Sequence, residues 1–141
     1  RPEDRIGILG SEPQICFYAQ RRSATPFVYM YPLMEEQPYA LRMQNELIED
    51  LEANPPAYIA YFPIAHSWFV QKNSEMKITA WIPQYLQEHY DKVGLVEIDD
   101  HEARYFWDDH QKGRQPGTRY FAVICKRKDY KPGLPTGHSG A

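Results

Sequence analysis

The sequence has few residues that would hold a small protein together by covalent or metal bonds. It contains two cysteines in 141 residues, Cys16 and Cys125, and they are too far apart for a CxxC-type metal or redox motif. We expect both to be small buried apolar residues, with a disulfide between the first helix and the last strand as the alternative. A chain of this length with 43% hydrophobic residues forms an ordinary core without such bonds.

A strong charge of one sign and a long apolar run are also missing. The chain has 16 Lys and Arg against 19 Asp and Glu, and its longest basic run is Lys126–Lys128. We therefore expect no nucleic-acid partner, because nothing here matches a phosphate backbone. The longest apolar stretch, Ala57–Ala65, is far shorter than the roughly 20 residues of a membrane helix. The start carries no signal-peptide pattern, so we predict a soluble chain.

No internal repeat or change of composition divides the chain. We predict a single domain over residues 1–131 and a flexible tail at 132–141, because the last stretch is rich in Gly, Pro and Ser. The first residue is Arg1 rather than Met, which is what we expect of a piece of a longer protein.

Apolar periodicity and turn residues divide the domain into alternating strands and helices. Ser11 and Gln14 have the spacing of a capping box for the first helix. Pro83 places the regular start of the third helix at about residues 80–82. The predicted strands are 5–10, 27–31, 57–62, 92–98, 103–107 and 120–126, and the helices begin near residues 14, 38 and 80.

This order of elements is typical of an α/β domain. We predict a three-layer α/β/α, Rossmann-like domain, in which a mostly parallel sheet has helices on both faces. The last two strands are expected to pair as a C-terminal antiparallel hairpin across a long loop at residues 108–118.

The loop after the first strand lies where doubly wound folds bind phosphate. Residues 7–12 lack both the G-x-G-x-x-G spacing and a G-K-[ST] ending. The loop is therefore an ordinary turn into a helix or, alternatively, a site where Ser11 and loop amides bind an anionic group. Arg21 and Arg22 also have two interpretations, since adjacent arginines can bind a phosphate or complement the end of a helix.

No group of residues makes a persuasive catalytic centre. Asp99–Glu102 and Asp108–His110 both combine acids with histidine, but neither has a recognised metal-ligand or glycosidase spacing. His66 and Ser67 lack the G-x-S-x-G context of a hydrolase nucleophile. We predict no catalytic residue, no metal ligand and no cofactor in this chain.

A longer motif begins at Gly10, where the first strand runs into G-S-E-P-Q, and continues through aromatic residues and R-R-S to Thr25. Further matches follow at Tyr31–Leu33, Tyr39–Ala40, Met43–Gln44, Tyr58–Ile59, Trp81–Leu86 and Tyr90. Together these residues resemble the C-terminal soluble region of bacterial membrane glycosyltransferases of the family 39 type, similar to dolichyl-phosphate-mannose protein mannosyltransferases.

The resemblance implies a parent whose multi-span membrane domain transfers a sugar from a polyprenyl-phosphate carrier at the outer side of the cytoplasmic membrane. In such enzymes the catalytic aspartate lies in an early external loop of the membrane domain. This chain is then expected to be a non-catalytic, periplasmic accessory domain. Its expected partners are its own transmembrane domain and a lipid-linked sugar or acceptor.

Glu12, Arg21 and Arg22 match the motif of that family, and together with Ser11 they are the expected ligand-binding residues. Residues 99–118 do not match it. The alternative function is a free-standing domain that binds a small molecule, a sugar phosphate or a nucleotide, with the loop Gly10–Glu12.

Overall fold

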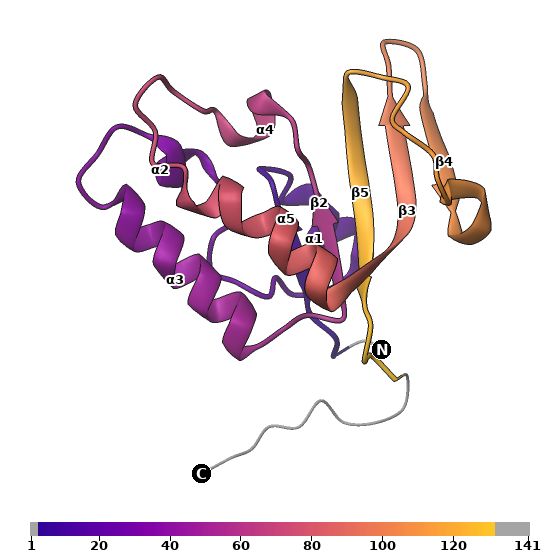
Figure 1. Ribbon diagram of the computed structural model, residues 1–141, viewed down its shortest axis with the longest axis horizontal. Helices are drawn as coiled ribbons and strands as arrows, with labels where there is room; N and C mark the ends of the chain where they lie inside the picture. Colours follow the sequence, from indigo (N-terminus) through magenta and orange to yellow (C-terminus); the bar gives the residue numbers. More distant parts are fainter. Residues whose placement is uncertain (1–2, 132–141) are drawn as a thin grey trace.

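The structure, a computed structural model, describes residues 3–131, and the tail predicted at 132–141 lies outside them. Figure 1 shows one twisted sheet with α3 and α5 lying together on one side. The elements in chain order are β1 (Ile6–Leu9), α1 (Gln14–Ala19), α2 (Tyr31–Met34), α3 (Ala40–Ala53), β2 (Tyr58–Tyr61), α4 (Ala65–Trp68), α5 (Lys77–His89), β3 (Tyr90–Ile98), β4 (Ala103–Trp107), the 3-10 turn η1 (Asp108–Gln111) and β5 (Tyr120–Arg127).

The mostly parallel sheet that the sequence predicts is wrong. The strand order is β1-β2-β5-β3-β4; β1 and β2 run parallel, and the other three neighbouring pairs are antiparallel. The predicted hairpin of the last two strands is wrong as well, because β5 pairs with β2 and β3 and leaves β4 at the edge. The short turn 99–102 makes β3 and β4 antiparallel, since parallel neighbours need a long crossover.

The segment 27–31, predicted as a strand, forms no strand of the sheet. Residues 22–24 lie along the outer edge of β1 instead, where the Ile6 amide donates to the Arg22 carbonyl (3.1 Å) and the Ala24 amide donates to the Ile6 carbonyl (2.8 Å). Further along, Met30 is buried and Pro32 lies in the first turn of α2, a position that suits proline. Aromatic and β-branched residues favour a strand at 27–31, but the edge of β1 is already occupied.

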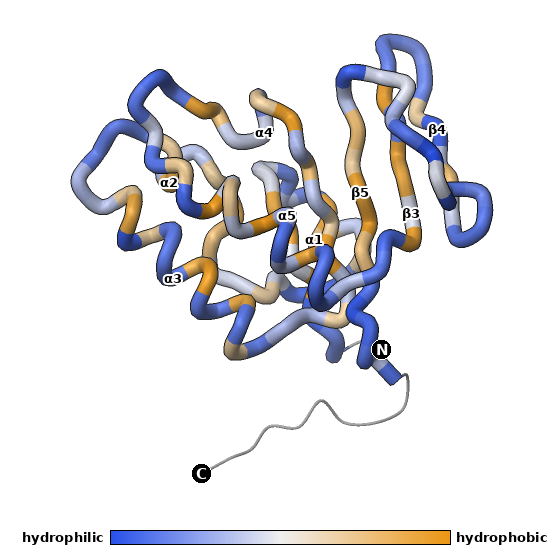
Figure 2. The backbone as a smooth tube through the Cα atoms, in the orientation of Figure 1, coloured by the Kyte–Doolittle hydropathy of each residue, from blue (hydrophilic) through white to orange (hydrophobic). Residues whose placement is uncertain are grey.

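The main core lies between the sheet and the helices on one of its faces. Apolar residues of α3 and α5 pack with residues of the strands in one cluster, and Figure 2 shows that both helices alternate between hydrophobic and hydrophilic positions. The core residues of this face include Leu9, Leu47, Leu51, Ile59, Ile78, Ile82 and Cys125. Burial raises the pKa of the Cys125 thiol to about 11. Both cysteines are free thiols, which corrects the disulfide alternative.

The opposite face has a smaller core under α1. Its buried residues Ile8, Ala60, Phe62 and Ala122 pack against Ile15 and Cys16. In residues 3–131 this six-residue helix is the helical cover of that face, so the predicted three-layer arrangement is wrong. Trp107 covers Gly94 on β3, where a Cβ would lie 2.4 Å from the indole ring.

One buried glutamine joins the helices. The Gln44 side chain donates to the carbonyls of Leu33 and Glu75, both at 2.8 Å, and accepts from the Ile78 amide at 2.9 Å. The last bond holds the first turn of α5, so that this helix begins at Lys77 rather than at the predicted residues 80–82. Pro83 is tolerated inside it on an exposed position.

Candidate functional site

The structure divides the four predicted site residues between two places. Ser11 and Glu12 follow the carboxyl end of β1, whereas α1 leads the chain back so that Arg22 lies beside Ile6, at the start of β1. Ser11 and Glu12 are therefore brought together, and Arg21 and Arg22 are brought together at the other end of the strand.

Ser11 and Glu12 brace two other segments of the chain. The Ser67 hydroxyl donates to Glu12 Oε2 (2.8 Å) and accepts from the Ser11 amide (2.9 Å), and the Ser11 hydroxyl accepts from the Met30 amide (2.9 Å). The predicted capping box is wrong, because no side chain caps α1 and the Ser11 hydroxyl bonds Met30 instead. Burial raises the pKa of Glu12, and the bond from Ser67 lowers it by less.

Gly10 allows this close packing. A Cβ at this position would lie 2.3 Å from Glu12 Oε2 and 2.6 Å from Ser67 Oγ, so a larger residue would push the braced side chains apart. The amide and hydroxyl of Ser11 are both engaged inside the protein. The geometry therefore favours the interpretation of this loop as a structural turn.

Arg21 and Arg22 line an open pocket beside α1, here called the α1 pocket, with a cavity volume of about 920 Å³. Its lining residues are Glu3, Arg5, Cys16, Phe17, Tyr18, Gln20, Arg21 and Arg22. The two rings are the most exposed apolar side chains described, with 79% of Phe17 and 80% of Tyr18 accessible, and their centroids lie 5.6 Å apart. Gln20 has a left-handed backbone with φ 51°, which ends α1 just before the arginines.

The three guanidinium groups of the α1 pocket have no carboxylate partner in the described part of the chain. Within residues 3–131, no ion pair joins Arg5, Arg21 or Arg22 to a carboxylate. Arg21 donates to the carbonyls of Ala19 (3.2 Å) and Gln20 (3.0 Å), and Arg5 donates to that of Ser23 (3.5 Å). Glu3 also lines the pocket. Because no ion pair within residues 3–131 engages these three cations, the pocket can attract an anion with several charge-assisted donors.

The acid and histidine clusters do not form a site together. Residues 99–102 make the turn before β4, and Asp108–His110 lie in η1 after it, so the two clusters are at opposite ends of β4. Asp99 accepts the amides of His101 (2.9 Å) and Glu102 (3.0 Å), which lowers the pKa of its carboxyl. The described part of the chain contains no group of three or more His, Cys, Asp or Glu residues that could hold a metal ion.

A buried carboxylate in the same region is structural. Glu97 on β3 accepts the Gly117 amide (2.8 Å), and its carboxylate lies 3.8 Å from Arg104 Nη2 and 3.7 Å from Arg114 Nε. Arg114 also stacks over the Phe106 ring at 3.6 Å. These contacts fasten the loop before β5 onto β3 and β4.

The hydrolase interpretation of residues 66 and 67 is not supported by their geometry. The Ser67 hydroxyl is bound to Glu12, and the His66 ring contacts Tyr120, with centroids 5.9 Å apart. In residues 3–131, no hydrogen bond joins these two neighbours, so Ser67 is paired with a carboxylate and not with the histidine that the hydrolase interpretation requires.

Sequence reasoning missed Arg5, Phe17 and Tyr18. The two rings have a signal in the helical period, because Ile15 and Cys16 face the sheet and their neighbours must then face solvent. Arg5 has no such signal, since it joins the α1 pocket only when residues 22–24 pair with β1.

In comparisons with known proteins, no family model, no curated protein and no solved structure matches this chain. Among the described residues, no helix has the length and apolar character needed to cross a membrane. The chemistry of the α1 pocket and the sequence resemblance are thus the two grounds for a function.

Proposed function

We propose that this chain is a non-catalytic accessory domain of an integral-membrane glycosyltransferase that takes its sugar from a polyprenyl-phosphate donor. The observation that carries the proposal is the α1 pocket, which combines two exposed rings with three guanidinium groups that have no ion pair within residues 3–131. The sequence resemblance supports the same kind of parent. The domain is then placed at the periplasmic face of the cytoplasmic membrane, against its own transmembrane domain.

The pocket has the chemistry that a lipid-linked sugar phosphate requires. Arginine forks bind phosphate oxygens in pairs, and exposed aromatic rings provide an apolar surface for an isoprenoid or a sugar ring. Glu3 and Arg5 place the pocket at the end of the molecule where the described chain starts (Figure 1). A membrane span upstream of this point would bring the pocket close to the lipid headgroups.

Binding without catalysis is useful in such an arrangement. A phosphate held by this domain would increase the local concentration of the donor near the membrane domain, where the catalytic aspartate is expected. The half-buried carboxylate of Glu12 and the buried carboxylate of Glu97 are held by hydrogen bonds that fix loops. We therefore assign the bond-making step to the membrane domain.

The same pocket also favours a second function, the binding of a soluble sugar phosphate by a free-standing domain. Its arginines and rings need no membrane to contact such a ligand. The two functions differ in the apolar part of the ligand and in what the gene encodes before Arg1.

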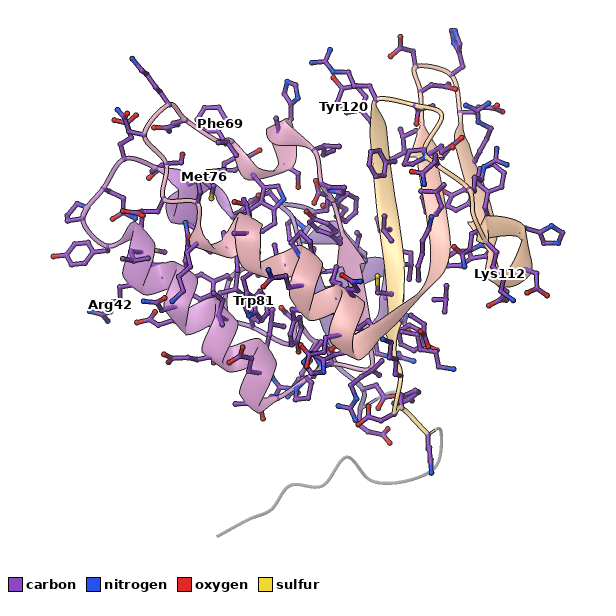
Figure 3. The ribbon with its side chains drawn as sticks, in the orientation of Figure 1. Arg42, Phe69, Met76, Trp81, Lys112 and Tyr120 are labelled. Atoms are coloured by element: carbon purple, nitrogen blue, oxygen red, sulfur yellow. The ribbon has the colours of Figure 1, made fainter. Side chains whose placement is uncertain are left out.

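An NMR titration of the isotope-labelled chain tests both candidates. The probes are farnesyl phosphate, mannose 1-phosphate and inorganic phosphate. The first function predicts that farnesyl phosphate binds most tightly and shifts the amide signals of residues 16–22. The double variant Arg21→Gln/Arg22→Gln should lose this binding, and Arg42→Gln on the far surface of α3 should keep it (Figure 3).

Preference for mannose 1-phosphate would favour the second function, and no shift with any probe would contradict both. The reading frame upstream of Arg1 separates them independently. Several hundred codons of hydrophobic spans with an early external aspartate are expected for the accessory domain, whereas a start codon directly before Arg1 would exclude it.

A further inference from the structure

A second group of exposed rings lies at the other end of β1. Tyr29, Tyr31 and Phe69, here called the aromatic strip, have 51%, 38% and 56% of their surface accessible. The centroids of Tyr29 and Tyr31 are 6.3 Å apart and those of Tyr31 and Phe69 are 5.4 Å apart, so the three rings form a continuous row. Figure 3 shows Phe69 on the outer surface after α4.

The brace around Ser11 holds both segments that carry the strip. The Ser11 hydroxyl binds the amide of Met30, the buried residue between the two tyrosines. Glu12 and the Ser11 amide bind Ser67, two residues before Phe69. The motif residues of the first loop therefore fix the positions of the three rings relative to each other.

Phe69 is held in a backbone conformation that a phenylalanine does not favour. Its φ is 56°, in the left-handed region, and its amide donates to the Ala65 carbonyl at 2.7 Å. The preceding Trp68 is buried and donates from Nε1 to the Phe62 carbonyl at 2.8 Å. Phe69 is thus the left-handed cap that ends α4, and this geometry leaves its ring beside Tyr31 with more than half of the side chain exposed.

We propose that the aromatic strip is a carbohydrate site that stacks on the pyranose rings of a glycan. Neighbouring rings of the strip are tilted by 44° to each other, so the row forms a twisted apolar surface on which the C–H faces of successive sugar rings can stack. The hydroxyls of Tyr29 and Tyr31 have no hydrogen-bond partner in residues 3–131, so they can bind sugar hydroxyls. Two neighbouring contacts along the row match a ligand with repeated rings.

The choice of a glycan as the ligand rests on the proposed function. The geometry of the three rings is independent of that function. The strip lies beyond the carboxyl end of β1, where Ser11 binds Met30 and Ser67, whereas Arg22 of the α1 pocket lies beside Ile6 at the start of β1. In an accessory domain joined to a membrane span at its start, the strip would face away from the lipid. A lipid surface is therefore the less suitable ligand for these rings.

Titrations of the full chain with cellohexaose, maltohexaose and α-1,6-mannohexaose test the proposal by NMR. At least one hexasaccharide should bind and shift the amide signals of residues 28–32 and 67–71. Phe69→Ala and Tyr31→Ala should weaken binding about five- to tenfold, as expected for the loss of one stacked ring. Tyr39→Ala, which removes an equally exposed tyrosine at the start of α3, should leave the affinity unchanged.

Ser11→Ala tests whether Ser11 acts as a positioning residue. This variant keeps all three rings but removes the acceptor of the Met30 amide, so glycan affinity should fall while the α1 pocket still binds farnesyl phosphate. A Ser11→Thr variant, which keeps the hydroxyl, should restore the affinity.

The proposal is overturned if none of the three hexasaccharides shifts these signals, or if the shifts fall on residues 16–22 instead. It is also overturned if sedimentation shows self-association that Phe69→Ala abolishes, since the strip is then a protein interface. The accessory-domain function fails on separate data, the farnesyl phosphate titration and the upstream reading frame.

Discussion

The two faces of the sheet differ in how completely they are covered. On the helical face, α2, α3, α4 and α5 enclose a core of sixteen buried residues, whereas the opposite face has four such residues under α1. The α1 pocket lies on the sparsely covered side, where packing is least. Buried packing is thus concentrated on one face, whereas the other face carries the exposed rings and arginines that we propose bind a ligand.

The largest effect on the free energy of unfolding is expected when one core side chain on each face is truncated to alanine. Leu47→Ala should lower the free energy of unfolding by about 3–4 kcal/mol, because Leu47 is fully buried between α3 and the rest of the core. Ile15→Ala in α1 should lower it by only about 1 kcal/mol, since Ile15 is partly exposed. Urea denaturation followed by circular dichroism measures both, and equal losses would contradict the comparison.

A smaller effect is expected at Glu12, at the boundary between the faces. Burial raises the pKa of this carboxyl above its unfolded value, so ionisation in the folded state costs stability. The protonated Glu12 carboxyl therefore contributes to the free energy of unfolding. This contribution is fully present below the unfolded pKa, and it is lost as the pH rises from about 4 through the folded pKa. Relative to Glu12→Gln, the wild-type chain should therefore become less stable with increasing pH in urea titrations. A difference that does not vary with pH would show that Glu12 titrates alike in both states.

Phe69 is an exception on the helical face, because its side chain is exposed although it follows α4. A substitution at this position tests whether its backbone conformation costs stability. Phe69→Gly should raise the free energy of unfolding by about 0.5 kcal/mol, since glycine adopts a positive φ without strain. Phe69→Ala is the matched control, because it removes the ring and keeps the strain. Thermal and urea unfolding should show a gain for glycine alone, and equal stability of both variants would argue against stored strain.

The smallest effect is expected for the arginines of the α1 pocket. Arg21→Gln/Arg22→Gln should change the free energy of unfolding by less than about 0.5 kcal/mol, because these side chains have no ion pair in residues 3–131. The same variant should lose farnesyl phosphate binding. A large loss of stability in urea would mean that the two arginines support the fold rather than a ligand.

The local pattern of the sequence predicted elements better than their arrangement. The amphipathic period of α3 is confirmed, because Leu47, Ile48 and Leu51 are buried as their spacing requires. The strand at 27–31 and the parallel sheet are wrong for one reason, which is that edge occupation and strand order depend on contacts distant in sequence. The spacing of apolar residues within a segment does not predict that β5 pairs with both β2 and β3.

The candidate site also depends on contacts between distant residues, which local patterns do not predict. The chemistry of Arg21 and Arg22 left a ligand and a helix end as alternatives, and the family resemblance made them expected ligand-binding residues. The structure places both at one pocket. The brace of Glu12 by Ser67 joins residues 55 positions apart, and Arg5 reaches the pocket only through pairing at the edge of β1. Residue type alone therefore did not distinguish a structural role from a binding role, and only the fold identified what each side chain contacts.

The position of β5 determines when this domain can fold during synthesis. It is the last strand to leave the ribosome, yet it lies in the centre of the sheet between β2 and β3. Until residues 120–127 emerge, the nascent chain holds two separate pieces, β1 with β2 and β3 with β4, each with an open edge. Folding is consequently completed after translation of the domain, and the unfinished chain is the form that chaperones meet.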